Sequence, residues 1–134
     1  MNKSIFVLSM LTVLISFSCI AETNNNDKRP MLWDFGAKKC MPCIKMVPIL
    51  DQLSVEYKDY FTVKFTDVWI SKNIREAKNF GIESIPTQIF FDKNSKELWR
   101  HTGYISKKDI LSKWKSLGYD FNKSHVKVNI HKEK

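Results

Sequence analysis

The sequence lacks the features on which several classes of protein depend. Its 134 residues contain no internal repeat and no long low-complexity segment, and only three cysteines and three histidines. Neither His101 nor His131 has a cysteine or carboxylate at ligand spacing, so neither is predicted to be catalytic. The apolar fraction of 43% and the aromatic fraction of 13% fit a globular protein. The length suits one domain with a core of its own, but not two.

The chain also lacks a basic cluster, although its formal net charge is +8. Lysines and arginines are scattered from Lys28 to Lys134 and do not gather with aromatic residues in one tight group. An excess of positive charge can favour nucleic acid or an anionic membrane, but this distribution is typical of a solvated basic surface. We therefore expect no nucleic-acid partner.

No apolar run is long enough to cross a bilayer comfortably, which takes about 20 residues. An uncharged apolar run extends from Ile5 to Phe17; Lys3 precedes it and the small residue Ala21 follows. This layout is typical of a secretory signal. We predict a signal peptide over residues 1–21 and an exported, periplasmic protein, with an uncleaved anchor or a buried helix as the alternatives.

Cys19, near the end of this segment, raises a further alternative, the lipidated cysteine of a membrane-anchored bacterial lipoprotein. The sequence Ser-Phe-Ser before it lacks the usual leucine three positions ahead of the cysteine. Cleavage after Ala21 would remove Cys19 and leave Cys40 and Cys43 as the pair of the mature chain. An exported compartment permits such a pair to form a disulfide.

The rest of the chain is predicted to contain a flexible lead at 22–30, a domain at 31–118 and a basic tail at 119–134. Alternating apolar residues at 126–130 leave a small edge strand as an alternative to fraying in the tail. Ser71 and Ser106 are predicted N-caps, and Gly81 is predicted to follow the end of a helix. The predicted strands are 31–35, 61–68, 87–91 and 98–102, and the predicted helices are 41–58, 71–80 and 106–117.

The helix predicted over 41–58 contains Pro48, which should kink it because proline removes one backbone donor. Apolar residues recur along this helix at helical spacing and predict its buried face. That face comprises Ile44, Val47, Leu50, Leu53 or Ser54, and Tyr57.

The order of elements is therefore β-α-β-α-β-β-α. The opening βαβ unit implies a parallel pair of strands and the closing hairpin adds an antiparallel part, so we predict an α/β fold with a mixed four-stranded sheet flanked by helices. Cys40 and Cys43 lie where the first strand gives way to the first helix. A C-x-x-C pair alone can be a structural staple, half of a metal site or a pair that exchanges electrons.

Further residues lie at particular positions around this pair. A proline directly precedes the second cysteine, an acid lies six residues before the first, a proline interrupts the helix, and a lysine lies in the next strand. An Ile-Pro-Thr sequence precedes the hairpin and a glycine follows it. These residues are Pro42, Asp34, Pro48, Lys64, Ile85-Pro86-Thr87 and Gly103. In this combination the chain resembles the thioredoxin superfamily from about Met31 to Leu117, which implies a minimal thioredoxin fold.

The chain departs from this family where thioredoxins usually carry two tryptophans, because it has Gly36 and Lys39 at these positions. The usual first strand and helix of a full-length thioredoxin are also not predicted, since the lead before Met31 is too short. These departures leave the core redox residues in place and alter the surface available to a partner.

Cys40 is the predicted nucleophile. A cysteine at the start of a helix meets unpaired backbone N–H groups and the positive end of the helix dipole, which favour the reactive thiolate. Lys38 and Lys39 add positive charge, or they simply form an exposed loop. Cys43, one helical turn later on the same face, is placed to attack a mixed disulfide at Cys40.

Asp34 is the candidate acceptor for the proton that Cys43 must lose, directly or through a water. A carboxyl group in an apolar strand is expected to have a raised pKa, which suits proton transfer near neutral pH. The resemblance implies that Lys64 lies near this acid and tunes it. The alternatives are that Asp34 ends its strand in solvent and that Lys64 is a solvated strand lysine.

The resemblance also implies that the peptide bond before Pro86 is cis and that Pro86 faces the cysteines. The backbone of Ile85 would then be free to pair with an extended substrate segment, and metal would be kept from capturing both thiolates. Met41 and Pro42 are expected to contact the same substrate. The alternative for Pro86 is an ordinary trans proline at the start of a strand.

These residues predict an exported thiol–disulfide oxidoreductase without a cofactor, acting on protein disulfides. The Met-Pro dipeptide and the isoleucine before Pro86 resemble reducing thioredoxins, so the resemblance implies reduction and an electron supply from a membrane relay of the DsbD or CcdA type. We expect a monomer, the default for this fold. The alternatives are a binding module or holdase with a permanently closed disulfide, and a carrier that holds a soft metal such as Cu(I) with Cys40, Cys43 and methionine.

Overall fold

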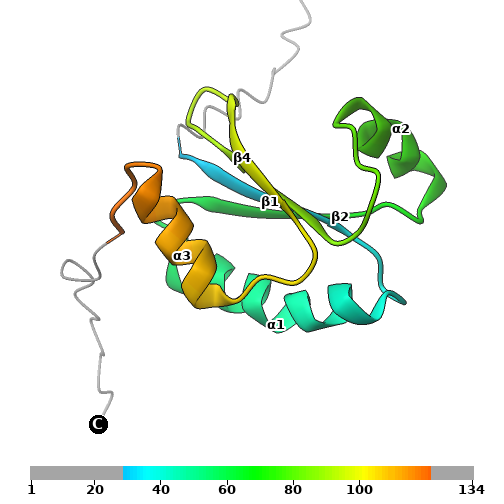
Figure 1. The fold of residues 1–134 in the computed structure, drawn as a ribbon, viewed down its shortest axis with the longest axis horizontal. Helices are drawn as coiled ribbons and strands as arrows, with labels where there is room; N and C mark the ends of the chain where they lie inside the picture. Colours follow the sequence, from blue (N-terminus) through cyan, green and yellow to red (C-terminus); the bar gives the residue numbers. More distant parts are fainter. Residues whose placement is uncertain (1–28, 122–134) are drawn as a thin grey trace, which may run out of the picture.

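The predicted order of strands and helices is confirmed. A computed structural model describes residues 29–121 of the chain (Figure 1). The predicted signal peptide with Cys19, nearly all of the lead and most of the tail, including residues 126–130, lie outside the described residues. The elements are β1 (Met31–Gly36), α1 (Met41–Glu56), β2 (Thr62–Asp67), α2 (Ser71–Asn79), β3 (Thr87–Phe91), β4 (Glu97–Thr102) and α3 (Lys107–Ser116).

The four strands form one mixed sheet in the order β2-β1-β3-β4. β1 and β2 are parallel, and the β1–β3 and β3–β4 pairs are antiparallel. α1 and α3 cover one face of the sheet, and α2 lies on the other (Figure 1). Because the carboxyl ends of β1 and β2 lie at the same edge, the start of α1 is held at that edge, directly after the central strand.

Each face of the sheet has its own core. The face below α1 and α3 packs Leu32 of β1 with Met46 and Leu53 of α1 and Trp114 of α3. The face below α2 packs Trp33 and Phe35 of β1 with residues such as Ala77. Since successive side chains of a strand point to opposite faces, this alternation assigns Asp34 to the face with α1 and α3.

The buried face of α1 differs from the predicted one. The buried residues of the helix are Cys43, Met46, Leu50 and Leu53, whereas the predicted Ile44 and Val47 are 43% and 46% exposed. The helix begins with the cysteine pair against the sheet, and burial of Cys43 rotates the neighbouring apolar positions to the border of the core. Pro48 lies inside a helix that continues on both sides of it.

The predicted caps are confirmed at one helix and wrong at another. The Ser106 hydroxyl accepts a hydrogen bond from the Asp109 backbone N–H at 3.2 Å and caps α3. Ser71, by contrast, is the first residue of α2; Ile70 occupies the N-cap position without a side-chain hydrogen bond. Gly81 follows α2 at φ +64°, a left-handed conformation that favours glycine, as its predicted place after the helix requires.

Candidate functional site

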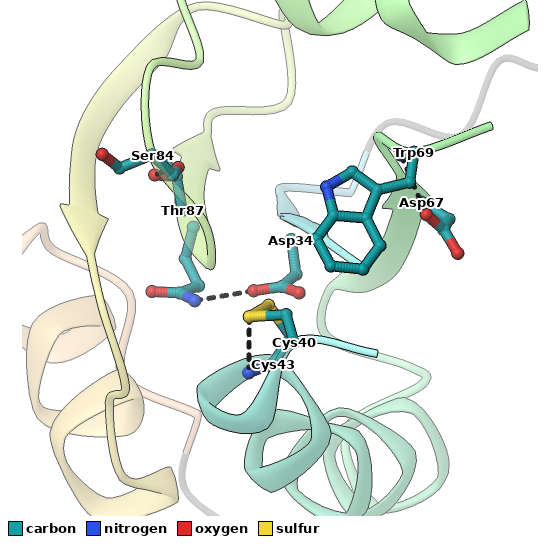
Figure 2. The surroundings of a disulfide bond; sticks show 8 residues. Asp34, Cys40, Cys43, Asp67, Trp69, Ser84 and Thr87 are labelled. Atoms are coloured by element: carbon teal, nitrogen blue, oxygen red, sulfur yellow. Dashed lines mark hydrogen bonds between the residues drawn. A yellow bond between two sulfur atoms is a disulfide. The ribbon is translucent and has the colours of Figure 1, made fainter. Parts of the chain in front are cut away.

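Cys40 and Cys43 form a disulfide at the start of α1 (Figure 2). Their Cα atoms are 5.2 Å apart. Cys40 is the N-cap of the helix, and its Sγ accepts a hydrogen bond from the Cys43 backbone N–H at 3.4 Å. Cys43 is only 2% exposed, while Cys40 is partly exposed. The sulfur of Cys40 is therefore the one that an approaching partner meets first.

The surroundings of Cys40 favour negative charge on its sulfur. The first turn of α1 contains no acidic residue, and the helix N-terminus directs backbone N–H groups and the positive end of its dipole at the N-cap. Lys38 and Lys39, just before the helix, are exposed. Pro42 lies in the first turn, where its missing N–H removes no helical hydrogen bond.

Asp34 is fully buried beside this disulfide, as Figure 2 shows. Its Oδ1 accepts a hydrogen bond from Gln88 Nε2 at 2.6 Å, and its Oδ2 has no hydrogen-bond partner among residues 29–121. Burial raises the pKa of Asp34 to about 6, and the hydrogen bond from Gln88 acts in the opposite direction. The carboxyl group can therefore exchange a proton near neutral pH.

Gly36 lies close to both Asp34 and Cys43. A Cβ atom at this position would lie 3.0 Å from a ring carbon of Phe65, 3.2 Å from Asp34 Oδ2 and 3.3 Å from Cys43 Cβ. Asp34 Oδ2 and the buried Cys43 thus both lie beside Gly36, where a side chain would crowd them. The sequence identified Gly36 only as a departure from the family pattern.

The four residues predicted to bind substrate lie together. Met41, Pro42, Ile85 and Pro86 line one groove of about 920 Å³ beside the cysteine pair, and Gly103 and Tyr104 line the same groove. The Ile85–Pro86 peptide bond is cis, the isomer that the resemblance implied. The Gly103 backbone N–H donates to the Pro86 carbonyl at 2.7 Å and ties the hairpin to this loop. Met41 and Tyr104 are exposed, so the groove is accessible from solvent.

Lys64 does not lie near Asp34, and the prediction that it tunes the acid is wrong. In the parallel β1–β2 pair, Lys64 is opposite Trp33, while Asp34 is opposite Phe65. Neighbouring residues of a strand face opposite sides of a sheet, so Lys64 lies on the face covered by α2. Its Nζ lies 3.5 Å from the centre of the Trp33 ring and 3.2 Å from Glu76 Oε1.

Two residues near the cysteines were not identified from the sequence. Gln88 is a fully buried amide within a strand that otherwise holds threonine and apolar residues, and this interruption was a usable signal. Trp69 is 59% exposed and belongs to the surroundings of the disulfide in Figure 2.

Within residues 29–121, no three histidine, cysteine or acidic side chains gather in a way that could hold a metal ion. The same part of the chain contains no helix with the length and apolar character needed to cross a membrane. His101, which was not predicted to be catalytic, is partly exposed, with Nε2 3.2 Å from the Tyr104 carbonyl.

Comparisons with known proteins agree with this geometry. A model of the thioredoxin family matches residues 17–116. The thioredoxin of Mycolicibacterium smegmatis is 32% identical over 100 residues, which are 75% of this chain and 88% of the relative. The thioredoxin of Chlamydia muridarum is 41% identical over 83 residues, 62% of this chain and 76% of the relative. A solved structure described as that of a malarial protein matches with a TM-score of 0.60 and 26% identity, over 66% of this chain and 96% of that one.

Proposed function

The chain belongs to the thioredoxin family of thiol–disulfide oxidoreductases and carries its Cys40–Cys43 pair, and we propose that it reduces protein disulfides outside the cytoplasm. The observation that carries this proposal is the contrast between the two sulfurs. Cys40 is partly exposed at the N-cap of α1 and its sulfur accepts a backbone N–H, while Cys43 is buried beside a carboxyl group.

The reaction begins with the reduced dithiol. The Cys40 thiolate attacks one sulfur of the substrate disulfide, forms a mixed disulfide and releases the first substrate thiolate, which takes a proton from solvent. Cys43 then loses its proton, attacks Cys40 Sγ and releases the second substrate thiolate. Two electrons pass from the dithiol to the substrate, and the Cys40–Cys43 disulfide is the oxidised product.

Asp34 accepts the proton of Cys43 in the second step. Two observations support this role: Oδ2 and Cys43 Cβ both lie within about 3.3 Å of the position that a Cβ at Gly36 would take, and burial raises the pKa of Asp34 to about 6. A carboxylate with an ordinary pKa would be a weaker base at neutral pH, so the raised value improves the match to a thiol. The proton then passes to the departing thiolate or to solvent.

The groove formed by Met41, Pro42, Ile85 and Pro86 receives an extended segment of the substrate. Its apolar residues lie beside the attacking sulfur, so a segment that binds there is held with its disulfide near Cys40. The backbone of Ile85 pairs with the segment as an added strand. No cofactor is required, because the dithiol itself supplies both electrons.

Export by the segment 1–21 is part of this proposal and follows from its sequence pattern. A reductase in an oxidising compartment must be reduced again after each turnover, and a membrane relay of the DsbD or CcdA type would supply the electrons. The protein works as a monomer. Export can be tested with the full chain by fractionation of the producing cell, and the monomeric state by sedimentation of the purified protein.

The first experiment combines two cysteine variants with an insulin-disulfide reduction assay. Cys40→Ser should abolish reduction, whereas Cys43→Ser should allow the first attack and accumulate mixed disulfides with substrate proteins. Circular dichroism of both variants checks that the fold is retained. Activity in a folded Cys40→Ser variant would contradict the mechanism, and a Cys43→Ser variant that traps no partner would favour a non-catalytic binding module.

The direction of electron flow is tested by the reduction potential of the pair in a dithiothreitol or glutathione buffer series. A value near that of thioredoxin, about −270 mV, fits a reductase. A value near that of the oxidant DsbA, about −120 mV, would instead identify a disulfide donor.

A further inference from the structure

We propose that Gln88 is a positioning residue for this reaction: its side-chain amide holds one oxygen of Asp34 and thereby presents the other oxygen to Cys43. This inference rests on the proposed function, because it needs Asp34 to be the proton acceptor. It adds a residue whose task is to set which oxygen takes the proton and at what pH.

The pairing of β1 with β3 brings the side chains of Asp34 and Gln88 together. Asp34 and Gln88 are directly opposite each other in the antiparallel β1–β3 pair, and both are fully buried. Opposite side chains on one face of such a pair lie within reach of each other. The 2.6 Å hydrogen bond from Gln88 Nε2 to Asp34 Oδ1 therefore links two central strands, and it fixes the rotation of the carboxyl group.

The direction of this hydrogen bond follows from the chemistry of the two groups. An ionised carboxylate only accepts hydrogen bonds, while an amide has one end that donates and one that accepts. Turning the Gln88 amide round would bring two acceptors together at 2.6 Å. The donating end must face Asp34 whenever Asp34 is ionised, and this is the state in which it can take a proton.

The oxygen that Gln88 leaves free is the one on the cysteine side. Asp34 Oδ2 has no partner among the described residues, and both it and Cys43 Cβ lie close to the position that a side chain at Gly36 would occupy. A carboxylate held at Oδ1 thus has its remaining acceptor sites beside Cys43. Without the amide, the group could turn and present either oxygen.

A neutral donor suits this place better than a charged one. Burial already raises the pKa of Asp34 to about 6, and the hydrogen bond from Gln88 lowers it, because donation to a carboxylate stabilises its charged form. An apolar residue at 88 would leave the carboxyl group protonated at neutral pH and unable to accept a proton. A lysine would pair with the carboxylate and weaken it as a base.

The test replaces Gln88 by leucine, which fills similar space and donates no hydrogen bond, in the full chain. The Asp34 carboxyl group is followed by carbon-13 NMR titration of the oxidised protein, in which neither Cys40 nor Cys43 titrates. Hydrogen bonds to charged groups are strong enough to move a pKa by about one to two units, so we expect an upward shift of that size. Gln88→Met, also without a donor, is the second variant if the leucine variant does not fold.

The second measurement in this test is the rate at which the reduced protein reduces insulin disulfides in a single turnover. If the pKa of Asp34 rises by about one to two units, the rate at pH 6 should fall by about five- to fiftyfold, while the rate at pH 9 should be unchanged. In an Asp34→Asn background, Gln88→Leu should have no further effect on the pH profile. Thr66→Val, at a buried polar position on the opposite face, is the matched control and should leave the Asp34 titration unmoved.

An Asp34 titration that does not move in a folded Gln88 variant overturns the inference, and so does an equal change of the pH profile in the Asp34→Asn background. Failure of the proposed function would give a different result, since the wild-type dithiol would then not reduce insulin at any pH. The NMR titration does not depend on activity, so the two failures are distinguishable.

Discussion

The two faces of the central sheet hold their buried polar side chains in different ways. On the face with α2, Trp33 Nε1 donates to Thr66 Oγ1 at 2.9 Å, and Thr66 Oγ1 donates to Glu76 Oε2 at 3.3 Å. Glu76 also pairs with the exposed Lys64. On the face with α1 and α3, Asp34 and Gln88 share one hydrogen bond, and each keeps an oxygen without a partner among the described residues.

The network of Trp33, Thr66 and Glu76 on the face with α2 is complete, whereas the pair of Asp34 and Gln88 on the other face is an incomplete network. A buried polar atom without a partner costs about 1–3 kcal/mol of stability, and most native networks avoid that cost. All three such atoms in residues 29–121, on Asp34, Gln88 and Trp114, belong to the face with α1 and α3. Asp34 and Gln88 lie beside the cysteine pair, so the incomplete network coincides with the place where the proposed mechanism needs a proton acceptor.

The largest expected effect is on the pH dependence of stability. The pKa of folded Asp34 is about 6 against 3.8 for an unperturbed carboxyl group, so its contribution to stability is complete below pH 4 and is lost as the pH rises through 6. The loss amounts to about 3 kcal/mol. Relative to Asp34→Asn, the oxidised wild type should lose this amount between pH 3 and pH 7.5 in urea unfolding. Thr66→Val, a change on the other face that removes no titratable group, should retain the wild-type slope, and a wild type parallel to Asp34→Asn would contradict the raised pKa.

The next effect is on the rate of the second chemical step. Asp34→Asn removes the proposed proton acceptor for Cys43, and general bases typically contribute at least about 10²-fold, equivalent to about 2.7 kcal/mol. Decay of a preformed mixed disulfide at pH 7, followed by stopped-flow fluorescence, should slow by this order. Attack by Cys40 should change little. A Glu76→Gln variant that slowed the same step equally would show that the two faces are not chemically distinct.

The sequence was sufficient for much of the site because the relevant signals are local. The order of elements follows from apolar periodicity and turn residues, and Cys40, Met41, Pro42 and Cys43 are neighbours in the chain. The groove also needed Pro86, which comes from a distant segment. Its assignment depended on the resemblance to thioredoxins, since spacing alone does not bring residue 86 to residue 40.

The wrong predictions concern the face of a strand or helix on which a side chain lies. Asp34 and Lys64 are in neighbouring strands, but the register places Lys64 opposite Trp33, and a shift of one residue reverses the face of every side chain. The same kind of error affected α1, where Ile44 and Val47 fit the apolar period but border the core instead of entering it. Sequence patterns give the period of an element more reliably than its rotation against its neighbours.

A smaller effect is expected from breaking the complete network. Thr66→Val keeps the shape of the side chain but leaves Trp33 Nε1 buried without its acceptor, which should lower the free energy of unfolding by about 1–2 kcal/mol. Reduction of insulin disulfides and its pH profile should remain those of the wild type. Urea unfolding and the reductase assay measure the two properties on one preparation. A loss of activity without loss of stability would mean that this face also takes part in the chemistry.

The smallest effect is expected at Lys64. Lys64→Met keeps an apolar stem over Trp33 and removes the ion pair with Glu76, which is partly exposed at both ends. Exposed ion pairs contribute about 0–1 kcal/mol and exposed cation–π contacts about 0.5–1 kcal/mol. Because both contacts share one exposed ammonium group, their contributions are not additive, and the free energy of unfolding should change by about 1 kcal/mol. The Asp34 titration should stay at its wild-type value, because the sheet separates the two side chains. Movement of that titration by a full unit would restore Lys64 as a partner of the acid and end the distinction between the two faces.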